Sequence, residues 1–308
     1  MPYVLFILTE NGRLIKLTPD ELLIAKVNDY GSAMEADASR LYVASYSYDV
    51  TTGVYLNLLE YRSQTDLSVE KTVDDFSSID IIRTLCLDRA HNIVYYHVNS
   101  KSKYCILPDL SYSSEVDLGF TPTMCTHFWP GSGWVYYSDG TKLVCRQDTG
   151  IVDLTDLLPT TAEIVQIFPF PKEELLVVAQ RDGYLTFINP DHNVVRYRKV
   201  ADKIDQVAPL DTLDLIVFGI VGDYYYIYDY ANDTTHSIPG PEGMGLYCTS
   251  GIHLASYSEK GVFMLYDENI DTYFNATIYD KDGNVVENIS VDIGVTDRVK
   301  SLSIAWFG

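Results

Sequence analysis

Short apolar runs, rich in β-branched and aromatic residues, alternate with polar turns along most of this chain. Typical runs are NIVYYHVN (92–99), GWVYYSD (133–139) and ELLVVAQ (174–180), and each is followed by a turn and a second run such as YLTFIN (184–189). Runs of this length and composition, bounded by turn residues, predict β-strands joined in hairpins. The best helix-like pattern covers 153–164, and Pro159 interrupts it.

The turns recur at a regular spacing. Glycines mark them in ENGRL (Gly12), TTGVY (Gly53), SDGTKL (Gly140), RDGYL (Gly183) and EKGVF (Gly261). Two further turns, SKSKY around Ser102 and GDYYY around Asp223, fill the gaps between these five. The seven turns span 249 residues from Gly12 to Gly261, which is 41.5 residues for each of the six intervals. Asn-Gly and Asp-Gly supply the positive φ that a two-residue hairpin turn needs. The chain therefore predicts a repeated unit of four short antiparallel strands.

Six such units occupy 31–75, 78–118, 121–158, 162–201, 203–240 and 243–294. The first stretch, 3–28, holds only three strands. The last residues, RVKSLSIAWFG (298–308), alternate apolar and polar positions, so we expect 298–307 to supply the missing fourth strand. The unit at 243–294 is longer than four strands require and is expected to carry an extra hairpin at 273–291, with its turn at DKDGN (280–284).

Four-stranded units at this period resemble the blades of the β-propeller superfamily. The resemblance covers the whole chain, 1–308, and implies an all-β fold: a single seven-bladed β-propeller domain whose C-terminal strand completes the N-terminal blade. Such closure would leave no open sheet edge. The sequence has no Trp-Asp blade ending, no double-glycine kelch signature and no sialidase-type Asp-box, so no subfamily is indicated.

Charge narrows the classes of partner. The net charge is −21 and the pI is near 4.4, which argues against nucleic acid and anionic membranes. The N-terminus, MPYVLFILTENG, lacks the basic region of a signal peptide, so we expect synthesis and folding in the cytoplasm. The five cysteines form no C-x-x-C pair, and we expect buried, reduced thiols.

Four carboxylates are predicted at the start of the innermost strand of four units: Asp80, Glu163, Asp205 and Asp297. Glu163 and Asp205 are 42 residues apart, and Asp80 and Glu163 are 83 apart, close to two repeats. Converging carboxylates could hold Ca²⁺ or Mg²⁺, and the resemblance to propellers includes metal-dependent lactonase-like members that use such a site. The alternative is that acidic loops align by chance, and we favour a protein without a cofactor.

Other catalytic signals are weak. Cys125 and His127 lie two residues apart on a predicted inner strand and could form a nucleophile couple, although a buried structural pair is the favoured interpretation. The sequence has no G-x-S-x-G, H-E-x-x-H or phosphate-binding glycine loop. Whether the protein is an enzyme is left open, with the non-enzymatic alternative favoured.

Tyrosine is abundant, with 25 residues, and suits both cores between sheets and recognition surfaces. We therefore favour a non-catalytic structural or interaction platform in a larger protein assembly. Its acidic composition is similar to that of virion components such as phage tail or capsid proteins. The alternative is a carbohydrate-binding or Ca/Mg-dependent hydrolase propeller. The partner-binding residues predicted from the long loop at 47–53 and the extra hairpin are Tyr48, Asp49, Asp280, Asp282 and Asn284.

Overall fold

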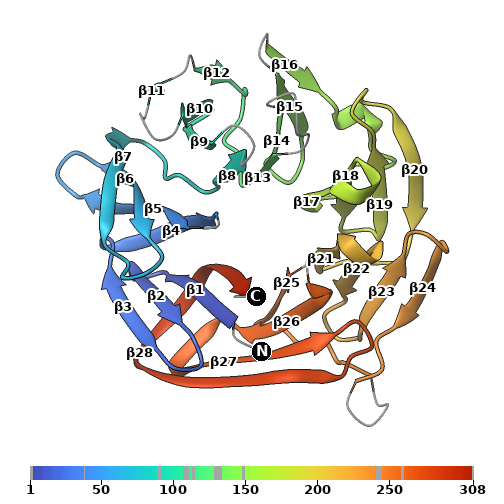
Figure 1. Ribbon diagram of the computed structural model, residues 1–308. Helices are drawn as coiled ribbons and strands as arrows, with labels where there is room; N and C mark the ends of the chain where they lie inside the picture. The colour runs from blue at the N-terminus through green and yellow to red at the C-terminus, as the bar shows by residue number, and fades with distance from the viewer. Residues whose placement is uncertain are drawn as a thin grey trace. The chain divides into compact units, whose positions relative to one another are not determined.

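A computed structural model describes residues 3–37, 39–88, 92–106, 111–112, 115–127, 134–147, 150–240, 245–257 and 260–306. Within these ranges the chain forms β-strands and three short 3-10 turns, with no α-helix (Figure 1). The chain divides into two compact units, which are described separately. Unit 1 contains residues 1–153 and 298–308, and unit 2 contains residues 154–297.

Unit 1 contains three complete antiparallel sheets and part of another, which has seven strands and continues into unit 2 through β28 (Val285–Trp306). The part in unit 1, described as the first sheet, has the order β28–β1–β2–β3, with β1 (Tyr3–Thr9), β2 (Arg13–Leu17) and β3 (Leu22–Lys26). The second contains β4 (Tyr30–Ala36), β5 (Arg40–Asp49), β6 (Val54–Ser63) and β7 (Val69–Ser78). The third contains β8 (Cys86–Asp88), β9 (Ile93–Val98), β10 (Lys101–Ile106), β11 (Ser111–Tyr112) and β12 (Val116–Asp117). The fourth contains β13 (Met124–His127), β14 (Val135–Ser138), β15 (Leu143–Gln147) and β16 (Gly150–Asp153).

Unit 2 continues the same pattern. Its 3-10 turns are η1 (Thr155–Leu157), η2 (Pro171–Glu173) and η3 (Asp211–Leu213). The first sheet contains β17 (Ile164–Phe170), β18 (Leu175–Gln180), β19 (Tyr184–Ile188) and β20 (Val194–Lys199). The second contains β21 (Gln206–Leu210), β22 (Leu215–Gly219), β23 (Tyr225–Asp229) and β24 (Thr234–Ser237). The third has the order β25–β26–β27–β28, with β25 (Ile252–Tyr257), β26 (Val262–Asp267), β27 (Asn269–Asp280) and β28 (Val285–Trp306).

Apolar clusters lie between consecutive sheets within each unit. In unit 1, Tyr42 and Ala44 of the second sheet pack with Val94 and Tyr96 of the third. In unit 2, Phe187 of the first sheet shares a cluster with residues of the second. A strand in the middle of such a stack has both faces covered, which explains why all six residues of β18 are buried and why its sequence is continuously apolar rather than alternating.

The predicted pairing of the C-terminal strand is confirmed. The last part of β28 runs antiparallel to β1, with Leu5 opposite Ile304 and Thr9 opposite Val299. The sheet that holds β2 and β3 therefore gains its fourth strand from the end of the chain. Within the described residues, no helix is long and apolar enough to cross a membrane.

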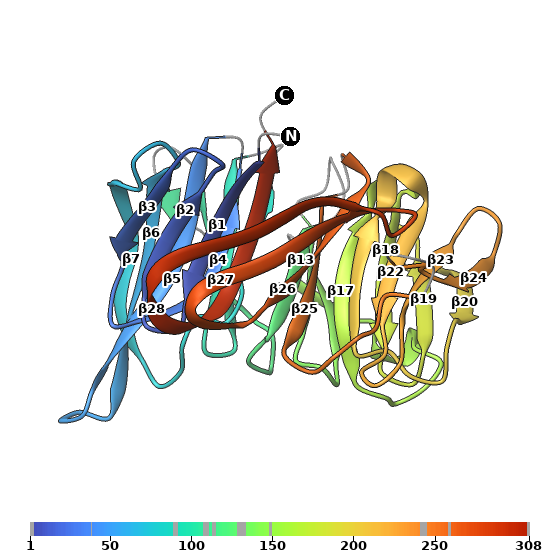
Figure 2. The same cartoon turned by 90° about the horizontal axis from the view of Figure 1, so that it is seen from below.

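The hairpin at 273–291 has a different role from the one expected. Its strands are β27 and β28, which lie side by side (Figure 2) and supply the third and fourth strands of the β25–β28 sheet. It is therefore not an addition to a complete four-stranded unit. The expected separation between 294 and 298 is also wrong, because β28 continues through Gly294, where φ is +69°. This glycine bends the strand without ending it.

Candidate functional site

The hairpin that joins β5 to β6 reaches past the other turns of unit 1 (Figure 2, light blue). Its tip is shaped by Asp49, whose carboxylate accepts the backbone N–H of Thr51 at 2.9 Å and the hydroxyl of Thr52 at 2.7 Å. The Thr52 and Thr51 hydrogen bonds lower the pKa of Asp49, because both stabilise the carboxylate. Gly53 closes the turn with φ at +72°, as the sequence predicts.

Four tyrosines cluster on one face of this hairpin and the adjacent strand β4. The rings of Tyr30 and Tyr46 stack with centroids 5.2 Å apart and planes 22° apart. Tyr55 contacts Tyr46 edge-on at 5.5 Å and Tyr48 at 5.1 Å. We call these four residues the tyrosine cluster. Aromatic pairs in these geometries stabilise each other, so the rings hold one another in place.

The tyrosine cluster continues the face that forms the core between the second and third sheets. Strand β5 places Tyr42, Ala44, Tyr46 and Tyr48 on one side, because side chains alternate along a strand. Tyr42 and Ala44 are buried, Tyr46 is half-buried and Tyr48 is 48% exposed. Asn57 lies where this face changes from buried to exposed side chains. It is buried and bonds the backbone of Asp80 and Ile82 at 3.1 and 3.2 Å.

Beyond Asn57 the face carries exposed apolar surface. Tyr30 is 39% exposed, and Val50 at the tip is 83% exposed. Burial is the main cause that raises the pKa of Tyr46, followed by the charge interactions of Tyr55 and Glu10, so its hydroxyl stays protonated at neutral pH. Protonated tyrosines present an apolar ring and a hydrogen-bonding tip, which is the composition of protein interfaces.

The other predicted partner-binding residues, Asp280, Asp282 and Asn284, form the β27–β28 turn in unit 2. Asp280 accepts the backbone N–H groups of Asp282 and Asn284 at 2.9 Å, and the Asn284 side-chain amide at 2.9 Å. Burial alone would raise the pKa of Asp280, but the hydrogen bonds from Asn284 and Asp282 lower it overall. This carboxylate therefore stabilises the turn. The predicted DKDGN hairpin turn is confirmed, with Gly283 at φ +81°.

The predicted metal ligands are each associated with protein groups. Asp80, in unit 1, forms an ion pair with Arg83 at 2.9 Å. In unit 2, Arg181 lies between Glu163, at 2.6 Å, and Asp205, at 2.9 Å. Lys203 also contacts Asp205 at 2.7 Å. Asp297, also in unit 2, is buried.

The repeat spacing correctly brought Glu163 and Asp205 close together, although it did not identify the arginine between them. Arg181 follows directly after the buried strand β18 in the predicted RDG turn, and its position there is the signal that could have been used. Burial would raise the pKa of Asp205, but the interactions with Lys203, the Val221 N–H and Arg181 lower it overall. Among the described residues, no group of three or more histidine, cysteine or acidic side chains could hold a metal ion.

Cys125 and His127 have separate partners. The Cys125 thiol lies 3.2 Å from the Thr84 hydroxyl. His127 Nε2 lies 3.2 Å from the carboxylate of Asp88, whose side chain is fully buried, and its ring stacks on Tyr95. Both side chains therefore contact the segment 84–95 of unit 1, and Cys125 is only partly buried, so the buried pair expected from the sequence is not what the structure shows.

No family model matches the chain. No curated protein matches its sequence either.

Proposed function

We propose that this protein is a non-catalytic interaction platform that binds a partner protein through the tyrosine cluster of the β5–β6 hairpin. The observation that carries the proposal is the continuous row of rings beyond Asn57, which leaves Tyr48 and Val50 exposed on a projecting hairpin. Exposed aromatic residues that are held rigidly lose little conformational entropy on binding, so they are effective anchors.

We also propose that the sheets form the seven blades of one β-propeller, with the seven-stranded sheet supplying two blades that share the long strand β28. Two findings support this. Consecutive sheets pack face to face within each unit, and the end of the chain pairs with its beginning in one sheet. A ring built this way is a rigid support with few exposed sheet edges. Such a support suits a platform whose contacts are made by its turns.

The partner that best fits this surface is a protein with a basic, arginine-bearing patch. The chain carries a net charge of −21, so approach of a cationic surface is favoured at long range. Tyrosine faces also attract guanidinium groups, and Arg40 already lies over the Tyr61 ring at 5.1 Å in the same sheet. We propose a phage virion as the assembly that contains this partner, on the basis of the acidic composition of the chain.

The test is the native size of the protein in lysate from its source, measured by gel filtration and blotting. The exposed residues Tyr48 and Val50 permit a double variant, Tyr48→Ser/Val50→Ser, with little effect on folding. Tyr197→Ser is a matched control, because Tyr197 is 50% exposed and lies in unit 2.

We expect the wild type and Tyr197→Ser to elute in a high-mass fraction at low salt, and the double variant to elute near 34.8 kDa. Raising the salt concentration should release the wild type, since screening weakens contacts between exposed charges. Elution of the wild type at its own mass would refute the platform proposal. Retention of the double variant at high mass would refute the role of the tyrosine cluster.

A further inference from the structure

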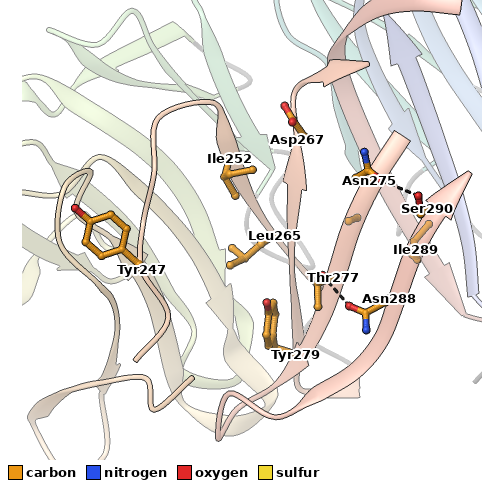
Figure 3. A pocket seen from close by; sticks show the side chains of 11 residues that line it. Tyr247, Ile252, Leu265, Asp267, Asn275, Thr277, Tyr279, Asn288, Ile289 and Ser290 are labelled. Atoms are coloured by element: carbon orange, nitrogen blue, oxygen red, sulfur yellow. Dashed lines mark hydrogen bonds between the residues drawn. The ribbon is translucent and has the colours of Figure 1, made fainter. Parts of the chain in front are cut away.

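A groove of about 480 Å³ lies in unit 2 on the β25–β28 sheet (Figure 3). Residues of all four strands line it, among them Ile252, Leu265 and Thr277, and Tyr247 from the segment before β25 lines it as well. This volume is within the range of small-molecule sites, about 300–1,000 Å³. The groove is distinct from the tyrosine cluster, which belongs to unit 1.

Two aromatic rings in the groove are held by neighbouring rings. Tyr279 stacks on the buried Phe263 with centroids 5.4 Å apart and planes 17° apart. Tyr247 is 55% exposed and meets Tyr224 edge-on at 5.8 Å, and the backbones of these two residues also form a β-bridge. Both rings are therefore pre-positioned, which lowers the entropic cost of ligand binding.

Two hydrogen-bonded pairs of polar side chains connect β27 to β28. The Thr277 hydroxyl donates to the Asn288 carboxamide oxygen at 3.1 Å, and the Ser290 hydroxyl donates to the Asn275 carboxamide oxygen at 2.8 Å. Within the described residues, neither carboxamide nitrogen donates to a protein acceptor. Each pair therefore keeps an N–H₂ donor and hydroxyl lone pairs for a ligand.

The charge of the groove limits the ligand class. Asp267 carries the only formal charge among the described residues that line it, and its carboxylate accepts the Asn269 N–H at 2.9 Å. Anionic ligands would meet this carboxylate and the net charge of −21. Neutral amides and hydroxyls beside apolar ring faces match a ligand that has both hydroxyl groups and C–H faces, which is the surface of a sugar.

We propose that this groove binds a neutral saccharide, with Tyr247 and Tyr279 against its C–H faces and Asn275 and Asn288 bonded to its hydroxyls. The proposal is independent of the tyrosine cluster. Removing one of these side chains should weaken binding, because a hydrogen bond or a ring contact to the ligand is lost without a replacement.

The experiment is saturation-transfer NMR on the full chain with six probes: glucose, galactose, mannose, N-acetylglucosamine, maltose and lactose. The variants are Tyr247→Ala and Asn288→Ala, both at exposed positions. Tyr273→Ala is the matched control. Tyr273 is 47% exposed and lies on β27, one of the strands that line the groove, but it is not itself a lining residue. Circular dichroism checks that each variant is folded.

We expect at least one of these sugars to receive saturation from the wild type and from Tyr273→Ala. Its affinity should fall about two- to tenfold in Tyr247→Ala and in Asn288→Ala, since each variant removes one contact to the ligand. Absence of transfer to all six sugars would overturn the proposal. So would a signal that persists in both groove variants, or one that Tyr273→Ala removes.

Discussion

The ion pair between Arg62 and Glu60 offers a sharp test of the packing in unit 1. Both side chains are nearly buried, with 6% and 7% of their surfaces exposed. Arg62 Nη2 and Nε donate to one Glu60 carboxylate oxygen at 2.7 and 2.9 Å, and Nη1 donates to the Leu67 carbonyl at 2.9 Å. Leu67 is buried with φ at +61°, a conformation that costs a leucine energy. Arg62 therefore holds both a carboxylate and a strained turn.

Arg62→Met leaves the Glu60 carboxylate buried without its cation and removes the bond to Leu67. Breaking a buried pair from one side costs about 3–5 kcal/mol. With an m-value of about 2 kcal/mol per M, the urea midpoint should fall by about 2 M. Tryptophan fluorescence reports this transition, since Trp134 belongs to unit 1.

Two comparisons distinguish the cost of a buried, unpaired carboxylate from the cost of removing an arginine in general. Arg40→Met removes an exposed pair with Glu70 in the same sheet, at 3.4 Å, and should cost about 1 kcal/mol or less. The double variant Glu60→Met/Arg62→Met leaves no buried charge at positions 60 and 62, so it should be more stable than Arg62→Met alone. An Arg62→Met midpoint no lower than that of Arg40→Met would refute the reasoning, as would a double variant no more stable than the single one.

Three further predictions concern pH, backbone strain and cations. Burial lowers the pKa of His97 to about 4, below its unfolded value near 6.5. The contribution of His97 to stability is therefore complete above pH 6.5 and falls as the pH drops toward 4. Urea unfolding should show a loss of about 2 kcal/mol between pH 7 and pH 5, and this loss should be absent in His97→Asn. Gly183→Ala would place a Cβ 1.9 Å from the Ala201 carbonyl oxygen, so its melting temperature by circular dichroism should fall far more than that of Gly119→Ala, where the space is open. Millimolar Ca²⁺ should leave the wild-type melting temperature unchanged, because Arg181 already neutralises the paired carboxylates; a rise would favour the predicted metal site.

Much of the strand pattern could be predicted because each hairpin carries a local signal. The Asp-Gly turn at Gly183 and the DKDGN turn at 280–284 both require positive φ, and both are found where expected. Pairing between distant segments was harder. The C-terminal strand could be assigned to β1 because 3–28 was one strand short of the repeat. The β27–β28 hairpin was misassigned because nothing local distinguishes an extra hairpin from the outer half of a sheet.

The candidate site was predicted only in part. The long loop pointed to Tyr48 and Asp49, and both lie on the projecting hairpin. Tyr30 and Tyr55 were missed because their contacts depend on the register of three strands, with Tyr30 opposite Tyr46 and Tyr55 opposite Tyr48. A register of this kind is fixed by packing over the whole face, so a short window of sequence does not determine it.

The exposed part of the tyrosine cluster follows from a difference in strand length between neighbouring sheets. Strands β5 and β6 have ten residues each, whereas β9 and β10 in the next sheet have six. A core between two sheets can extend only as far as the shorter one, so the remaining positions of the longer strands keep core-like aromatic side chains without a cover. A difference in strand length between neighbouring sheets therefore separates the exposed Tyr48 from the buried Tyr42 on the same strand, and composition alone does not contain this information.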